Sequence, residues 1–94
     1  MIKRYKKIEC NDGFEISVQA SSLAYCYPRN NVGPYEEVEL GYPSEQEHLI
    51  VQYAEDRNNL KNTVYPSVPV DVVLTVIKKH GGIHSGELPP LAAI

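Results

Sequence analysis

Residues 68–82 have the sequence VPVDVVLTVIKKHGG, which carries the signals that begin and end a helix. Pro69 suits the first helical turn, because the N–H that proline lacks would be unpaired there. Asp71 follows in the first turn and two lysines lie in the last, so these charges complement the helix dipole. The glycine pair that follows can adopt the left-handed conformation that closes a helix. We therefore predict a helix over residues 69–80.

Most of the surface of this predicted helix is apolar. Asp71, Thr75 and the two lysines form one polar stripe, and the remaining surface is covered by Val70, Val73, Leu74, Val76 and Ile77. Because β-branched residues have modest helix propensity, the helix would be marginal on its own in water. We therefore expect it to pack on a sheet.

The chain before the helix contains the alternating patterns that are typical of short strands. Asp12-Gly13 is a hairpin signal, and the residues after it alternate between apolar and polar side chains. A second alternating run and a short apolar run follow further along the chain. The predicted strands are residues 5–10, 14–20, 35–42 and 49–53, with residues 23–27 as a further short candidate.

These elements predict an α+β fold: a small antiparallel sheet of four or five strands with one C-terminal helix packed on one face. The core should combine the apolar positions of the strands with those of the helix. We expect it to contain Ile16, Val18, Val38, Leu40, Val73, Leu74 and Ile77.

The composition indicates one ordered domain over residues 1–94, with residues 83–94 as an extended or flexible tail that contains two consecutive prolines. The net charge of −3 argues against direct nucleic-acid binding. No apolar run approaches the roughly 20 residues that a membrane span needs, and no signal-peptide core follows the basic N-terminus. We therefore expect a cytoplasmic protein that does not engage a membrane.

The residue types of a zinc site are present, but their spacing is unsuitable. Cys10 and Cys26 are far apart in the sequence, and a glycine pair separates His80 from His84. No nucleophile elbow, zinc-protease motif or phosphate-binding glycine loop occurs in the chain. We therefore expect no catalytic residue, metal or cofactor, and a thiol-dependent enzyme that uses Cys26 is the least favoured alternative.

The middle of the chain is rich in tyrosine and contains one arginine within a proline- and glycine-rich loop. Tyrosine and arginine are enriched in binding hot spots, because they bury a large area at modest entropic cost. An ordinary covering of a small sheet by tyrosine rings is the competing interpretation. The predicted binding residues are Tyr25, Tyr27, Arg29, Asn30, Tyr35, Glu37, Glu39 and Tyr42.

A second use of the same loop remains open. Arg29 and the backbone N–H groups of residues 30–33 would suit a small anion or a nucleotide, with the neighbouring tyrosines stacking on it. The alternative function is therefore the sequestration of a small anionic ligand.

The charges are distributed unevenly along the chain. Residues 1–7 contain only basic charged side chains, whereas residues 36–56 contain seven acidic residues and no lysine or arginine. The acidic segment is either a solvated face or a mimic of nucleic acid that is directed at a basic partner. Complementary charge and open sheet edges also predict a homodimer.

The phrases DGFEISVQAS, AYCYPRNNVGPYEEVELGYPSE, YAEDRNN and VPVDVVLTVIKKHGGI resemble small uncharacterised accessory proteins of tailed bacteriophages and prophages. The resemblance covers about residues 8–91 and carries over no catalytic residue. It implies a protein that acts in the cytoplasm of an infected bacterium. Our leading hypothesis is accordingly a non-catalytic accessory protein that binds and modulates a bacterial host protein, for example as an anti-defence inhibitor.

Overall fold

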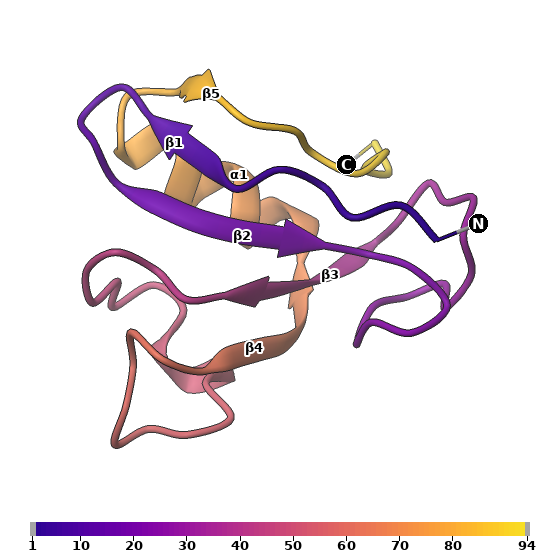
Figure 1. Ribbon diagram of the computed structural model, residues 1–94, viewed down its shortest axis with the longest axis horizontal. Helices are drawn as coiled ribbons and strands as arrows, with labels where there is room; N and C mark the ends of the chain where they lie inside the picture. The colour runs from indigo at the N-terminus through magenta and orange to yellow at the C-terminus, as the bar shows by residue number, and fades with distance from the viewer. Residues whose placement is uncertain (1, 94) are drawn as a thin grey trace.

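The computed structural model describes residues 2–93, which form an antiparallel five-stranded sheet with one α-helix behind it (Figure 1). The elements are β1 (Ile8–Cys10), β2 (Glu15–Gln19), β3 (Glu37–Gly41), the 3-10 helix η1 (Val51–Tyr53), β4 (Val64–Pro69), α1 (Val70–Lys79) and β5 (Ile83–Ser85). The strand order is β4-β3-β2-β1-β5, so α1 leaves one edge of the sheet and leads to the other. The predicted α+β class is confirmed.

The hairpin that joins β1 to β2 has the predicted turn. Gly13 adopts φ +93°, a conformation that glycine enters without a steric penalty. The Asp12 carboxylate accepts a hydrogen bond of 2.9 Å from the Phe14 N–H, which closes the turn locally. This turn sets the register that places Ile8 opposite Ile16.

The alternation in the strands separates a packed face from an open face. Ile8, Ile16, Val18 and Leu40 are buried on the helix side. The neighbouring positions lie on the other face, where Glu9 is opposite Glu15 and Gln19 is opposite Glu39 in the strand register. The open face is therefore polar and rich in glutamate.

The helix agrees with the prediction except at Leu74. Pro69 and His80 are its cap residues, and it buries Val70, Val73, Val76 and Ile77 against the sheet. Leu74 was expected in the core, but it is 39% exposed. It follows Asp71 by three positions and therefore shares the outer side of the helix with it. The sheet therefore covers less of the apolar surface of α1 than the sequence indicated.

We expect Val73→Ala and Leu74→Ala to differ in cost although the two residues are adjacent. Val73 is 2% exposed, so its truncation should lower the free energy of unfolding by about 1.5–3 kcal/mol through lost burial and a cavity. Leu74→Ala should cost about 1 kcal/mol or less, because much of the side chain stays in water. Urea denaturation of both variants measures the difference. Equal costs would mean that the buried face of α1 is misassigned.

Two predicted strands are wrong. Residues 49–53 contain η1 instead, because the Tyr53 N–H donates to the Ile50 carbonyl and Ile50 N–H donates to that of Glu47. A short apolar run does not distinguish a buried turn from a strand. Residues 23–27 lie in a loop, where only an isolated bridge from Tyr27 to Glu37 has strand geometry.

The C-terminal segment runs back along the N-terminal segment, and the sequence did not predict strand β5 within it. After β5 pairs with β1, the Glu87 N–H donates to the Lys6 carbonyl, and the Glu87 carboxylate accepts from the Lys6 N–H and the Lys3 ammonium. Leu91 then forms a bridge with Tyr35. Within residues 2–93, none of the helical structure has the length and apolarity of a membrane span.

Candidate functional site

Four large and exposed apolar side chains lie on the connection between β2 and β3. We call it the 21–36 loop. Leu23 is 74% exposed, Tyr25 49%, Tyr27 59% and Val32 76%. These residues lie within ten positions of one another, beyond the end of β2 (Figure 1). A group of large apolar side chains held in water is a typical feature of an interaction surface.

The 21–36 loop is held by hydrogen bonds to its own residues. Asn30 Oδ1 accepts from the N–H groups of Val32 and Gly33, at 3.0 and 2.9 Å. The Asn31 side chain accepts from Ser22 N–H at 2.8 Å, and the buried Tyr35 hydroxyl donates to the Asn30 carbonyl at 2.8 Å. Such a loop loses little conformational entropy on binding.

Arg29 and Tyr25 form a pair at the surface of the loop. The Arg29 guanidinium carbon lies 5.3 Å from the centre of the Tyr25 ring, within the range of a cation–π contact. Glu39 Oε1 accepts a 2.9 Å hydrogen bond from the Tyr25 N–H and so ties the loop to β3. Among residues 2–93, no carboxylate lies within ion-pair distance of Arg29. Its charge is therefore available to a partner.

The structure brings together some of the predicted binding residues and separates the others. Tyr25, Tyr27, Arg29 and Asn30 share the 21–36 loop, with Glu37 and Glu39 on the adjoining open face. Tyr35 also belongs to this loop, but its side chain is 1% exposed and its hydroxyl donates to the Asn30 carbonyl. Tyr42 follows the far end of β3, where its N–H donates to the Thr63 carbonyl, and so lies outside the 21–36 loop.

Two of the four N–H groups predicted to cradle an anion at residues 30–33 are engaged by the loop itself. The Val32 and Gly33 N–H groups donate to Asn30 Oδ1, so they do not point at a free ligand site. Arg29 remains exposed, but the loss of these two donors leaves it fewer backbone groups to help fix a phosphate.

A pocket of about 160 Å³ adjoins the 21–36 loop, and its lining was not predicted from the sequence. It forms because the Gln19 side chain hydrogen-bonds both backbone groups of Tyr5, at 2.9 and 2.7 Å, and holds the N-terminal segment beside the loop. Its lining residues are Ile2, Lys3, Arg4, Gln19, Ser21, Leu23, Ala24 and Glu39. The basic N-terminal segment was the only sequence signal for it.

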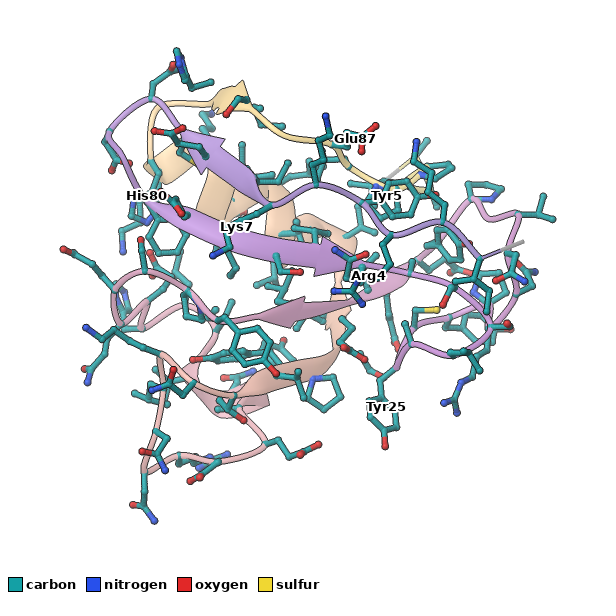
Figure 2. The ribbon with its side chains drawn as sticks, in the orientation of Figure 1. Arg4, Tyr5, Lys7, Tyr25, His80 and Glu87 are labelled. Atoms are coloured by element: carbon teal, nitrogen blue, oxygen red, sulfur yellow. The ribbon has the colours of Figure 1, made fainter. Side chains whose placement is uncertain are left out.

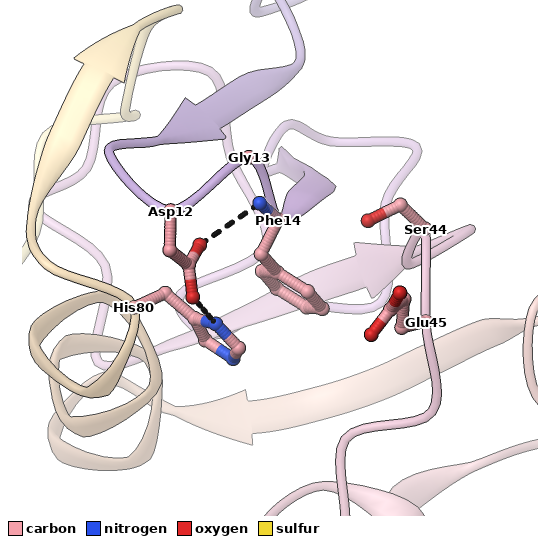
Figure 3. Close-up of a pocket in the computed structure, with 6 residues that line it drawn as sticks. All are labelled: Asp12, Gly13, Phe14, Ser44, Glu45 and His80. Atoms are coloured by element: carbon pink, nitrogen blue, oxygen red, sulfur yellow. Dashed lines mark hydrogen bonds and ion pairs between the residues drawn. The ribbon is translucent and has the colours of Figure 1, made fainter.

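A second site surrounds His80 at the end of α1 (Figure 3). Its Nδ1 lies 2.6 Å from Asp12 Oδ2, and its Nε2 lies 2.7 Å from Glu47 Oε1. The Phe14 ring stacks on the imidazole at 4.0 Å between centroids. A surface pocket of about 250 Å³ next to it is lined by Asp12, Gly13, Phe14, Ser44, Glu45 and His80.

The charges of this cluster support one another. Burial alone would raise the pKa of Glu47, but hydrogen bonds from the Leu49 N–H, Lys79 and His80 outweigh it and lower that pKa. Burial alone would lower the pKa of His80, but the Glu47 and Asp12 carboxylates outweigh it and raise that pKa. The pKa of Asp12 is lowered, first by the Phe14 N–H and then by His80. His80 is therefore favoured as an imidazolium between two carboxylates.

This arrangement is suited to holding segments together rather than to proton transfer. Both ring nitrogens of His80 are engaged by carboxylates, so neither is free to act as a base toward a substrate. The cluster joins the β1–β2 turn, the end of α1 and the connection that contains Glu47. Glu47 is 1% exposed, and no local pattern predicts its burial because its neighbours in the sequence are polar.

We expect stability to fall as the pH rises through neutrality. The pKa of His80 is raised in the folded state. The stability that His80 contributes is therefore complete at pH values below its unfolded pKa of about 6.5. That stability is lost as the pH rises through the pKa of His80 in the folded protein. The lowered pKa values of Asp12 and Glu47 remove stability in acid instead, below about pH 4.5. The melting temperature should therefore be higher at pH 6 than at pH 8.5. A His80→Gln variant should flatten this slope, and an unchanged slope would contradict the role of His80.

Neither cysteine belongs to the hydrogen-bonded cluster around His80. Cys10 and Cys26 are both buried free thiols, and burial raises the pKa of Cys10. The Cys26 thiol donates to the Ser21 carbonyl at 3.2 Å. Within the described part of the chain, no cluster of histidine, cysteine and acidic residues has the geometry of a metal site.

Comparison of the chain with models of protein families, with curated proteins and with solved structures found no match.

Proposed function

We propose that the protein is a non-catalytic accessory protein of the phage type, which binds and modulates a bacterial host protein through the 21–36 loop. The observation that supports this proposal is the exposure of Leu23, Tyr25, Tyr27 and Val32 on a loop that is internally hydrogen-bonded. Inhibition of a host defence component is the specific form of this hypothesis.

A partner that covers this loop gains free energy by burying its exposed side chains. Burying a large apolar side chain contributes about 1.5–3 kcal/mol. The Tyr27 hydroxyl can also form a hydrogen bond with a partner, and the Arg29 guanidinium can donate two parallel hydrogen bonds to one carboxylate. Because the loop is already held in place, little of this gain is lost to ordering.

The bacterial host and the phage origin derive from the resemblance described above. The resemblance supplies the class of partner, and the 21–36 loop supplies the surface. The acidic character of the open sheet face would keep nucleic acid away and favours a protein as the partner.

The test is affinity capture of host proteins from bacterial lysate, followed by quantitative mass spectrometry. We expect Tyr27→Ala and Arg29→Ala each to weaken binding of the recovered partner by more than about 1 kcal/mol, or about fivefold, as interface anchors do. His84→Ala removes an exposed side chain from β5 and serves as the control. Reproducible capture that both loop variants leave unchanged would contradict the proposal.

Sequestration of a nucleotide or another small anion is the second candidate. Arg29 above Tyr25 favours it, and the occupied N–H groups of Val32 and Gly33 count against it. A thermal-shift screen separates the two functions, because a ligand that binds only the folded state must raise the melting temperature.

The predicted homodimer is a proposal as well, and the sheet restricts how it would form. The β4 edge contains Pro66 and Pro69, and the Ser67 N–H already donates to the Tyr25 carbonyl. Prolines and irregular geometry protect an edge from pairing. A dimer that continues the sheet would therefore pair at β5.

A further inference from the structure

The pocket beside the 21–36 loop is apolar on one side and basic on the other. Leu23 and Ile2 supply the apolar side and are 74% and 39% exposed. Lys3 and Arg4 supply the basic side. Figure 2 shows Arg4 projecting from the N-terminal segment near the end of β2, with Tyr25 projecting from the loop below it.

The basic residues near this pocket differ in whether they have partners. Lys3 lies 3.2 Å from Glu87, and Lys7 lies 3.8 Å from Glu15. Arg4 and Arg29 have no carboxylate within ion-pair distance among residues 2–93. Arg4 thus lines the pocket without an ion-pair partner, and Arg29, which lies against the Tyr25 ring of the adjoining loop, also has none. Both stand in a protein whose net charge is −3.

The acid within the pocket lining does not neutralise these arginines. Glu39 lines the pocket, but one of its carboxylate oxygens accepts the Tyr25 N–H at 2.9 Å. This bond orients Glu39 toward the loop backbone and fixes the position of Tyr25. Tyr25 in turn carries the Arg29 guanidinium above its ring.

We infer that this pocket binds an acidic segment of the partner protein, in which an aliphatic or aromatic side chain is flanked by carboxylates. The inference rests on the proposed function, because it names the chemistry of the partner at the same surface. The apolar side chain would enter between Ile2 and Leu23. The flanking carboxylates would pair with Arg4 and Arg29, whose planar donor groups match a carboxylate in two parallel hydrogen bonds.

The negative charge of the open sheet face favours a short acidic segment over a nucleic acid as the occupant of the pocket. A nucleic acid that reached Arg4 would also approach the open sheet face, where Glu9, Glu15, Glu37 and Glu39 lie. Phosphates are repelled by such a face, whereas a short acidic segment can end at the two arginines. The partner would therefore contribute a local acidic stretch rather than a continuous polyanion.

Selection from a library of random twelve-residue peptides on the immobilised full-length protein tests the inference. The enriched peptides should contain Asp or Glu on both sides of Leu, Ile or Phe. The dissociation constant of the strongest peptide should rise about fivefold or more in Arg4→Ala and in Arg29→Ala, as for a desolvated charge pair. Binding should also weaken as the salt concentration rises.

Arg57→Ala is the matched control. It removes the same side chain from the exposed segment between η1 and β4, where Arg57 donates to the Gln52 carbonyl. Its net charge equals that of Arg4→Ala, so a purely long-range electrostatic effect would weaken binding equally in both. Equal weakening would overturn the inference. Melting curves of all three variants show whether each is folded.

Other outcomes also overturn the inference. The peptide selection would overturn it by enriching no peptide or by enriching basic or uncharged peptides. Light scattering would overturn it by showing a dimer that Arg4→Ala dissociates, because a second copy of the chain would then occupy the pocket. If a host protein binds through Tyr27 and Arg29 but is unaffected by Arg4→Ala, the inference fails and the proposed function stands. Failure of the proposed function appears separately, as the absence of a captured partner that depends on Tyr27.

Discussion

Glu47→Ala should lower the free energy of unfolding by about 2–4 kcal/mol, because it breaks a buried ion pair and leaves its partners without an acceptor. The Glu47 side chain is 1% exposed. Its Oε2 accepts from Lys79 at 2.9 Å and from the Leu49 N–H at 3.0 Å, and its Oε1 lies 2.7 Å from His80 Nε2. The cost should stay below that of a fully buried pair, because Lys79 is 41% exposed and can return to water.

Denaturant unfolding measures this effect, and Glu45→Ala is the control. Glu45 is also a glutamate of the same connection, but it is exposed at the rim of the pocket. Glu45→Ala should therefore change stability by about 0.5 kcal/mol or less. Glu47→Gln should fall between the two, because the amide oxygen can still accept one hydrogen bond. Equal costs for Glu45→Ala and Glu47→Ala would contradict the structural role of Glu47.

Gly86→Ala should destabilise the protein by about 2–4 kcal/mol through overpacking and backbone strain. Gly86 has φ +107°, and a Cβ at this position would overlap the Lys7 carbonyl oxygen and lie 2.7 Å from Ile8 Cα. The contact is made by backbone, so it cannot be relieved by rotation of a side chain. The C-terminal segment would have to move away from β1.

Gly13→Ala separates the two causes of this loss. Gly13 has φ +93°, but a Cβ there would meet no atom within 4 Å. This variant should cost about 1–2 kcal/mol, which is the backbone strain alone. Thermal unfolding of both variants gives the comparison. A cost of Gly86→Ala no larger than that of Gly13→Ala would mean that the C-terminal segment does not pack on β1 as described.

The sequence predicted those parts of the fold that local rules determine. The helix has its own proline, dipole charges and glycines, so its bounds were predicted within one residue at each end. The first hairpin carries Asp12-Gly13 between alternating runs, and it formed as expected. The Leu74 prediction failed because local periodicity shows which positions of a helix are apolar but not how many of them the sheet covers.

The parts that were missed depend on residues far apart in the chain. Strand β5 has only three exposed residues, so it has no pattern of its own and exists because β1 offers an edge. Glu47 is buried because Lys79 and His80, more than thirty positions away, compensate its charge. The predicted binding set was partly brought together: five of its members share the 21–36 loop, although Tyr35 is buried there, whereas Tyr42 lies beyond the far end of β3.

Hydrogen–deuterium exchange of the protein with its captured partner tests most directly that the 21–36 loop is the binding surface. We expect slower amide exchange on binding in this loop and in the N-terminal segment around Arg4, with little change in the loop between η1 and β4. The N–H groups of Ser22, Tyr25, Val32 and Gly33 already donate to side chains. The clearest signals should therefore come from peptides that contain Arg29 and Asn30, whose N–H groups donate to no acceptor within residues 2–93. Protection confined to the outer face of α1 or to β5, with the 21–36 loop unchanged, would contradict the account.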